Sequence, residues 1–191
     1  LPPDISSIAG PGDIDIRISP GLSFGTGHHP TTRLCLAALD RLFFSTGLSG
    51  HLLQGGKAGD IGTGSGVLAM AACLAGMSQC MAWETDPNAV CEACRNVAAN
   101  GLETKVNVIH GTMAAQDLRL SLVMANLRFP TLKQLAPDIC SILIPNGHLI
   151  LSGVRAWEMD ELKTHYRAMG FSIDWEREAK LWGALALTKK S

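Results

Sequence analysis

Apolar and polar positions follow two periods along this chain. Residues 13–18 alternate strictly between polar and apolar side chains, which is typical of a strand with one face in solvent. Other short runs, such as 121–125, are almost wholly apolar, as buried strands of a parallel sheet are. We predict strands over residues 13–18, 57–60, 80–83, 106–109, 121–125, 148–151, 171–178 and 184–188. We predict helices over residues 31–39, 67–75, 87–99, 131–143 and 158–169.

The alternation of strands and helices predicts an α/β fold, with a mostly parallel sheet and helices on both faces. The last two strands are expected to be antiparallel neighbours. Ligands of such sheets bind outside the carboxyl ends of the strands. Asp60, Glu84, Gly111 and Asn126 each stand at the end of a predicted strand, so we expect them at one edge of the sheet.

Three local features of the sequence bear on individual predicted strands and helices. Small residues fill 57–59, where a central strand usually has Val or Leu, and the sequence offers no reason for it. Asp86 is a predicted N-cap, and Asn100 with Gly101 is a predicted helix stop. Pro137 predicts an interruption or a bend in the helix over 131–143.

The stretch from Asp60 to Gly66 reads as a glycine-rich loop between a strand and a helix. Its spacing is GxGxG, whereas a dinucleotide loop reads GxGxxG and cradles a pyrophosphate. Asp60 should repel a phosphate and attract an ammonium group, and Glu84 can accept both hydroxyls of a ribose. These features favour S-adenosylmethionine over NAD. A tight glycine turn without a ligand and a nucleotide enzyme of another kind remain alternatives.

A second polar loop covers residues 24–32 and is dense in glycine, hydroxyl and imidazole groups. Pro30 is placed for the first turn of the following helix, where proline is favoured. We interpret this loop as a lid over the ligand. The alternative is an ordinary helix start with Thr31 or Thr32 as the capping hydroxyl.

Composition limits the remaining possibilities. The 191 residues are 47% hydrophobic and carry a formal charge of -1, which predicts one globular domain without a large nucleic-acid footprint. No apolar run approaches the roughly 20 residues of a membrane span, and no signal peptide is evident, so a cytoplasmic location is expected. The chain begins with Leu, so a fragment of a longer protein and a stand-alone protein are both open.

Six cysteines are interpreted as reduced, small apolar side chains of a cytoplasmic protein. Cys91 and Cys94 form a CxxC within a predicted helix, without a second pair at zinc spacing. A metal or redox role for this pair is the alternative.

Taken together, the loop 60–66, Glu84 and Asn126 resemble a class I S-adenosylmethionine-dependent methyltransferase. The string from Phe24 to Thr32 resembles, more narrowly, the lid motif of the PrmA family, and Trp182 before the last strand is a further match. That family modifies lysine side chains and the N-terminal amine of a ribosomal protein at the base of the large-subunit stalk. The resemblance covers residues 14–188, nearly the whole chain.

The resemblance implies a Rossmann-like, mostly parallel seven-stranded sheet with an antiparallel C-terminal strand. It implies S-adenosylmethionine as cofactor and a ribosomal protein as acceptor, with no metal, no membrane and no direct nucleic-acid contact. Residues 1–20 would be a linker and an N-terminal strand, and 21–191 the methyltransferase domain. The family's substrate-recruiting N-terminal domain is not visible in this sequence.

The resemblance also implies roles for single residues. Asn126 would lie beside the methionine end of the cofactor and orient the entering amine, as the catalytic residue. The implied cofactor contacts are Thr32 in the lid helix, the loop residues Asp60, Gly62, Thr63, Gly64 and Gly66, Glu84 with Thr85, and Asn126. Thr26, His29 and Thr31 are weaker matches to the lid motif.

The chain departs from the family pattern at three places. Glu84 replaces the usual Asp, His28 replaces a frequent Thr, and Arg128–Pro130 replaces smaller residues after Asn126. A proton-accepting role for His28 or His29 is an alternative to a loop-stabilising one. Two alternative functions also remain: a methyltransferase for RNA or a small molecule, and a binding domain that performs no chemistry.

Overall fold

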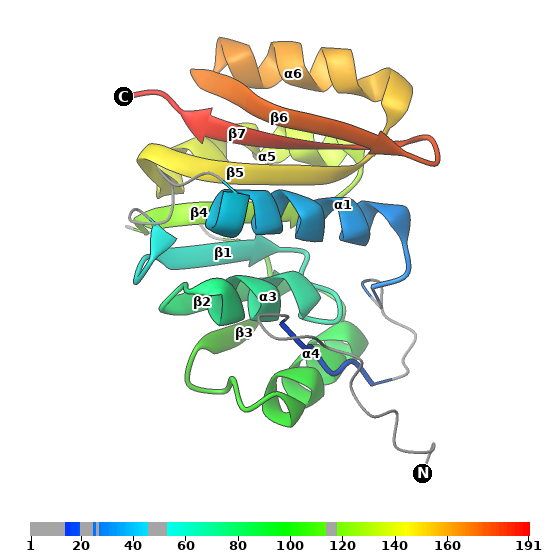
Figure 1. Ribbon diagram of the computed structural model, residues 1–191, viewed down its shortest axis with the longest axis vertical. Helices are drawn as coiled ribbons and strands as arrows, with labels where there is room; N and C mark the ends of the chain where they lie inside the picture. Colours follow the sequence, from blue (N-terminus) through cyan, green and yellow to red (C-terminus); the bar gives the residue numbers. More distant parts are fainter. Residues whose placement is uncertain (1–13, 20–24, 26, 46–52, 114–117) are drawn as a thin grey trace.

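The computed structural model describes residues 14–19, 25, 27–45, 53–113 and 118–191. Its seven strands form one sheet in the order β3-β2-β1-β4-β5-β7-β6 (Figure 1). The five strands β3, β2, β1, β4 and β5 run parallel, and β7 runs antiparallel to both of its neighbours. The strands are β1 (Lys57–Ile61), β2 (Gln79–Glu84), β3 (Val106–His110), β4 (Leu120–Asn126), β5 (Leu143–Arg155), β6 (Phe171–Ala179) and β7 (Trp182–Lys189).

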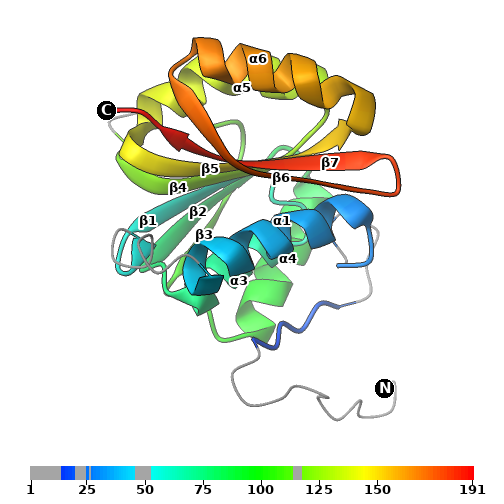
Figure 2. The same ribbon diagram turned by 45° about the horizontal axis from the view of Figure 1, so that its top comes forward.

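Helices cover both faces of this sheet, as Figure 2 shows with the sheet nearly edge-on. One face carries α1 (Pro30–Asp40), α3 (Val67–Ala75) and α4 (Pro87–Ala99), and the other carries α5 (Phe129–Ile142) and α6 (Met159–Ala168). Short turns follow α1 (η1, Arg41–Ser45) and β5 (η2, Ala156–Glu158). The predicted α/β fold class is therefore confirmed.

Each face has its own buried cluster, and β4 contributes to both. Leu122 and Met124 belong to the cluster under α1 and α3, whereas Val123 and Ala125 belong to the cluster under α5 and α6. Because successive side chains of a strand point to opposite faces, a strand covered on both sides must be apolar throughout. This explains the continuous apolar run in the sequence.

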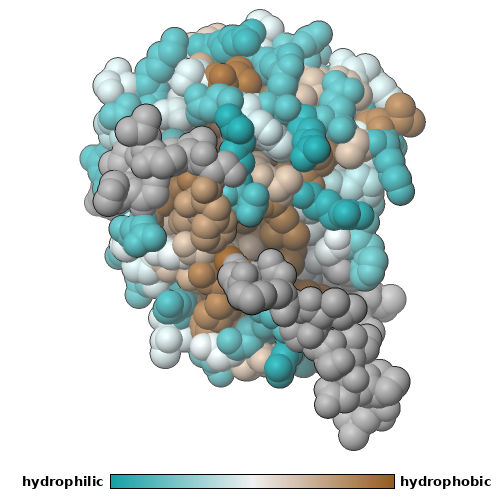
Figure 3. All heavy atoms as spheres, viewed as in Figure 1, coloured by the Kyte–Doolittle hydropathy of each residue, from teal (hydrophilic) through white to brown (hydrophobic). Residues whose placement is uncertain are grey.

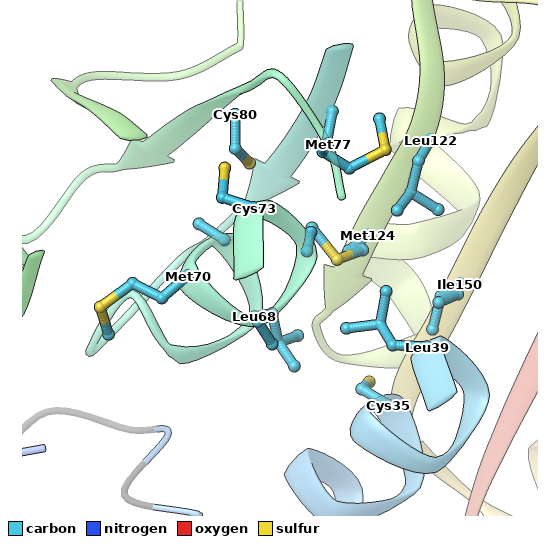
Figure 4. Packing of buried hydrophobic residues seen from close by; sticks show 14 of the residues in the cluster. Cys35, Leu39, Leu68, Met70, Cys73, Met77, Cys80, Leu122, Met124 and Ile150 are labelled. Atoms are coloured by element: carbon cyan, nitrogen blue, oxygen red, sulfur yellow. The ribbon is translucent and has the colours of Figure 1, made fainter. Parts of the chain in front are cut away.

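Sulfur-containing side chains are concentrated in the first cluster, where cysteines and methionines of α1, α3 and the sheet pack together (Figure 4). Cys35, Cys73 and Cys80 are free and buried there, as small apolar residues are expected to be. Burial raises the pKa of the Cys73 thiol to about 11. Cys91 and Cys94 are exposed on α4.

The small residues of β1 have a packing reason. A Cβ on Gly59 would lie 2.8 Å from Cδ1 of Leu120 and 3.0 Å from Cζ3 of Trp83. A larger residue at this position would displace two buried side chains of the neighbouring strands. The glycine therefore lets β2 and β4 bring bulky side chains over the central strand.

The prediction of a strand over 13–18 was wrong for its described part, because residues 14–19 form no strand. The alternation nevertheless reflects a real face, since Ile16 and Ile18 pack against the first cluster. The backbone on the other side bonds to asparagine side chains of α4 instead of a neighbouring strand. Sequence periodicity identified the buried face but not the kind of partner.

Two further elements differ from the prediction at residues that were expected to interrupt a helix or end a strand. Helix α5 continues through Pro137 without interruption. Strand β5 is 13 residues long, and its pairing with β7 passes a register shift between Ser152 and Val154, where the sequence predicts an end.

The last two observations concern one face of the surface and the length of the helices. Apolar atoms reach the surface near the middle of the face that carries α1 and α3 (Figure 3). Among the described residues, no helix is long and apolar enough to cross a lipid bilayer.

Candidate active site

The predicted site residues gather where the sheet changes its strand order. Strand β1 lies between β2 and β4, and the glycine loop leaves β1 between Glu84 at the end of β2 and Asn126 at the end of β4. Such a switch point is where α/β sheets bind ligands. Gly111 lies farther out and donates its N–H to the carbonyl of Glu84 at 2.8 Å.

The glycine loop is held to β2 by its backbone. The N–H groups of Gly62 and Thr63 both donate to the carbonyl of Trp83, at 2.9 and 3.0 Å. Gly62 has φ +73°, and a Cβ there would lie 2.6 Å from Cδ2 of Leu127. Only glycine therefore satisfies both the turn and the close contact with the chain after β4. Helix α3 begins directly after the loop, with Gly66 as its N-cap.

Asp60 stabilises this loop by accepting hydrogen bonds from the loop and from α3. Its side chain is 1% exposed, and its Oδ2 accepts hydrogen bonds from the Thr63 hydroxyl (2.6 Å) and the Ala69 N–H (3.2 Å). Burial raises the pKa of the Asp60 carboxyl to about 6, against the two hydrogen bonds that lower it, and the charge of Glu84 raises it slightly further. A cation near the loop would favour the ionised form. Contact between Asp60 and a ligand ammonium stays a prediction.

Glu84 accepts three backbone hydrogen bonds. Its Oε2 accepts from Gly64 N–H (3.0 Å), and its Oε1 accepts from the N–H groups of Thr85 (2.7 Å) and Asp86 (3.0 Å). The extra methylene relative to Asp lets this carboxylate curl back over its own backbone. An ionised carboxylate offers about four acceptor positions, so one remains for a ligand hydroxyl. Asp86 caps α4 through Asn88 N–H at 2.9 Å, which confirms the predicted N-cap.

Asn126 presents an acceptor that the described protein does not use. Its Oδ1 is buried and has no hydrogen-bond partner among the described residues. The next residue, Leu127, is held from two sides, because its N–H donates to Ser152 carbonyl at 3.0 Å and its backbone lies against Gly153. Gly153 has φ +86°, and a side chain there would collide with the Leu127 backbone. The backbone that follows β4 is thus held against β5.

The N-terminal turn of α1 closes the same site from the other side. His29 is the N-cap: its Nδ1 accepts from Thr31 N–H (3.4 Å) and lies 2.7 Å from the Thr31 hydroxyl. The alternative of Thr31 or Thr32 as the cap is therefore wrong, because His29 caps α1. The Thr32 hydroxyl is fully buried and has no partner within the described parts of the chain.

Helix α1 lies close to the strand ends. Cys35, one turn after Thr32, lies beside Asp60 and Ser152, and burial raises the pKa of its thiol. At the start of the helix, the His29 ring packs edge-on against Trp182, with ring centroids 5.1 Å apart. The Arg155 guanidinium covers Trp182 at 3.8 Å from the ring centroid. This stack fixes the start of α1 against β7.

Most predicted residues are thus brought together. His29, Thr31, Thr32, the loop 60–66, Glu84, Thr85 and Asn126 surround one edge of the sheet. Thr26 lies outside the described residues, and His28 is exposed. No group of three His, Cys, Asp or Glu side chains suited to a metal occurs in the described ranges.

Sequence reasoning missed four residues that hold the chain around the site but are not assigned to the ligand. Ser65 donates its hydroxyl to Gly25 carbonyl (2.8 Å), and Asn96 donates Nδ2 to Ser65 carbonyl (2.9 Å). Arg155 stacks on Trp182, and Asn100 binds the backbone of Arg17. The signal available for Asn96 was a polar residue on the apolar face of a predicted helix. A buried amide is normally hydrogen-bonded, so such a residue indicates a contact with another part of the chain.

The comparison with known families decides what this arrangement belongs to. The sequence model "Ribosomal protein L11 methyltransferase (PrmA)" matches residues 4–190. The chain belongs to the PrmA family. It is 35% identical over 188 residues to the ribosomal protein L11 methyltransferase of Actinobacillus pleuropneumoniae serotype 5b (strain L20), covering 98% of this chain and 61% of the relative. It is 36% identical over 188 residues to the relative from Geotalea uraniireducens (strain Rf4), covering 96% and 59%. The chain thus spans about 60% of the length of these relatives.

Solved structures agree with this membership. The ribosomal protein L11 methylase of Lactobacillus delbrueckii subsp. bulgaricus superposes with a TM-score of 0.78 at 28% identity, covering 92% of this chain and 84% of that one. The Thermus thermophilus 16S rRNA N2 G1207 methyltransferase, solved with AdoMet and guanosine, superposes with a TM-score of 0.70. At 20% identity, covering 88% of this chain and 45% of that one, the second match shows only the shared class I methyltransferase fold.

Proposed function

We propose that this PrmA-family chain binds S-adenosylmethionine at the glycine loop and transfers its methyl group to amine nitrogens of ribosomal protein L11. The acceptor amines would be lysine side chains or the N-terminus. Residues 21–191 would form the methyltransferase domain and residues 1–20 a linker before it. A ribosomal acceptor would place the reaction in the cytoplasm.

The observation that carries the proposal is a pair of buried, unpaired polar atoms at one edge of the sheet. Thr32 Oγ1 and Asn126 Oδ1 both lack partners among the described residues. Leaving such an atom unsatisfied costs about 1–3 kcal/mol, so a ligand that bonds to it is strongly favoured. With the spare acceptor position of Glu84, the chain offers polar groups for both ends of an adenosyl amino acid.

The residues present fit the cofactor. Glu84 would accept a hydrogen bond from a ribose hydroxyl, the loop from Gly62 to Gly66 would pass under the methionine part, and Thr32 would close over it from α1. The charge of Asp60 would favour the ligand ammonium. S-adenosylmethionine supplies a methyl group already activated on a sulfonium, so the protein's task is to position the acceptor and exclude water.

Asn126 would orient the acceptor. Its Oδ1 and the Leu127 carbonyl can each accept a hydrogen bond from an amine at the tip of β4. The amine must arrive neutral, although a free lysine has a pKa of about 10.4. A water-poor site beside a cationic cofactor lowers that pKa, which eases loss of the proton to water.

The test supplies purified ribosomal protein L11 and, separately, ribosomal RNA to the chain with labelled S-adenosylmethionine. We expect label in L11 and not in RNA, and peptide mapping should place it on lysine or the N-terminal amine. An L11 variant with its modified lysines changed to Arg is the matched control. Label in RNA alone, or cofactor binding without transfer to any L11 amine, would contradict the proposed acceptor.

A further inference from the structure

Asn96 of α4 and Asn100, the C-cap residue of this helix, connect parts of the chain that are far apart in sequence. Asn96 and Asn100 lie one helical turn apart, and both bind the backbone of the segment 14–19. Asn100 accepts from Arg17 N–H (2.9 Å) and donates to Arg17 carbonyl (2.8 Å). It therefore pairs with Arg17 as a neighbouring strand would.

Asn96 makes a different connection. Its side chain is fully buried, its Oδ1 accepts from Ser19 N–H at 3.0 Å, and its Nδ2 donates to Ser65 carbonyl at 2.9 Å. Ser65 belongs to the glycine loop. One amide thus links the segment 14–19 to the loop proposed to carry the cofactor.

Ser65 binds the upstream chain at a second point. Its buried hydroxyl donates to Gly25 carbonyl at 2.8 Å, and a Cβ on Gly25 would lie 2.7 Å from that hydroxyl oxygen. The chain before α1 is therefore linked to Ser65 at two points. Gly25 binds Ser65 directly, and Ser19 is linked to it through the side chain of Asn96. Neither link uses a group assigned to the cofactor.

We propose that Asn96 is a positioning residue that couples docking of the segment 14–19 to cofactor binding at the glycine loop. A ligand over the loop restricts the Ser65 peptide, which holds Asn96 in the orientation that binds Ser19. By linkage, a docked segment must strengthen ligand binding by the same factor. The inference rests on the proposed function, because it requires the loop to bind the cofactor.

Asn100 provides the matched control. It anchors the same segment and caps the same helix, but among the described residues its hydrogen bonds do not include the glycine loop. Loss of Asn100 should loosen the segment without removing the coupling. Asn96→Asp is a finer variant, since it keeps the acceptor for Ser19 N–H and loses the donor to Ser65.

The experiment measures amide hydrogen exchange of the peptide covering 14–19, with and without S-adenosylhomocysteine, alongside calorimetric titration. In the wild type we expect ligand to slow this exchange about threefold or more. In Asn96→Ala the slowing should vanish and the dissociation constant should rise about tenfold. Asn96→Asp should also lose the slowing. Asn100→Ala should exchange faster in both states, yet keep the ligand-dependent slowing and an affinity within about twofold of wild type.

The outcomes separate the two proposals. Binding heat with unchanged exchange at 14–19 in the wild type overturns the coupling and leaves the proposed function standing, and this result needs no variant to fold. Ligand-dependent slowing that survives in Asn96→Ala also overturns it. Exchange of the β4 peptide reports whether each variant keeps its core. The absence of any binding heat in the wild type overturns both proposals.

Discussion

The two sides of the site differ in how they use their polar groups. On the glycine-loop side, Asp60 and Glu84 together accept five hydrogen bonds, two at Asp60 and three at Glu84, all from the loop and the helix starts. On the opposite side, Thr32 and Asn126 each present a buried polar atom without a described partner. The first side is shaped by the protein's own contacts, whereas the second offers the polar atoms that we propose a ligand binds.

This difference separates stability from function. Substitutions on the glycine-loop side should damage the fold and the affinity together, because the same bonds maintain both. Substitutions of Thr32 or Asn126 should spare the fold, because no described residue makes a hydrogen bond to Thr32 Oγ1 or Asn126 Oδ1. The contrast can be tested position by position.

The largest effect is expected from Gly62→Arg. The position combines a left-handed φ with close contact to Leu127, so the side chain must push the loop from the site. Calorimetry with S-adenosylhomocysteine should detect no binding. Gly101→Ala is the control, since it has φ +65° with no atom within 4 Å. It should cost about 1–2 kcal/mol of stability and keep its affinity. Normal binding by Gly62→Arg would show that the loop does not carry the ligand.

A pH-dependent effect is expected from Asp60. Its pKa is raised from 3.8 to about 6 by burial, so the folded state holds the proton more tightly than the unfolded state. The resulting stability is fully present below pH 3.8 and is lost as pH rises through about 6, a loss of about 3 kcal/mol. Urea unfolding between about pH 4 and pH 7 should show this slope in the wild type and not in Asp60→Asn. Equal slopes would contradict the buried, protonated carboxyl.

The same titration should appear in binding. A ligand ammonium favours ionised Asp60, so the affinity for S-adenosylhomocysteine should rise as pH increases through about 6 and then level off. In Asp60→Asn this rise should be absent. An affinity independent of pH in the wild type would place the ammonium away from Asp60.

Asn126→Ala should reduce methyl transfer about a hundredfold, with cofactor affinity changed less than about threefold. Its stability should stay near wild type, because the lost acceptor is unpaired in the ligand-free protein. Single-turnover transfer, calorimetry and urea unfolding test the three statements. Asn107→Ala, on the exposed side of β3, should leave all three unchanged. Unchanged turnover in Asn126→Ala would remove its catalytic role.

The smallest and sharpest comparison is between two adjacent, fully buried threonines. Thr31 bonds to His29, whereas the Thr32 hydroxyl is unpaired. Thr31→Val should therefore lower stability by about 1 kcal/mol. Thr32→Val should keep or raise stability and weaken cofactor binding about tenfold. The reverse pattern in unfolding and calorimetry would invert the assignment of the two hydroxyls.

Sequence reasoning succeeded where the signal is local. The glycine loop, the Asp86 cap and the polar ends of β2 and β4 all depend on a few consecutive residues and on hydrophobic period. Parallel strands then bring Glu84 and Asn126 to one edge without further information. The same locality explains why the cap of α1 was left open: His29 and Thr31 both suit an N-cap region, and only the hydrogen bond from Thr31 N–H to His29 Nδ1 shows which one is the cap.

Other features could not be predicted from local patterns. The alternation of 14–19 is compatible with a strand, yet its partners Asn96 and Asn100 lie 77 and 83 residues away on a helix. Gly59 is an unusual residue for a central strand, and its reason lies in Leu120 and Trp83, which occupy the space that its Cβ would take. Strand β5 continues past Gly153 because Val154 and Arg155 pair with Gly183 and Trp182 of β7.

The sequence by itself determined the order of strands and helices from residue 30 onward, the two-faced apolar strand β4 and the loop that opens α3, because each is encoded by neighbouring residues. Only the tertiary structure decided which polar atoms are satisfied. Thr32 and Asn126 each keep a polar atom without a described partner, whereas Ser65 and Asn96 form hydrogen bonds that link the upstream chain to the loop. Both outcomes depend on side chains that are dozens of residues apart in the sequence. Such pairings follow from packing, which brings distant segments to hydrogen-bond distance and excludes the water that would otherwise satisfy them.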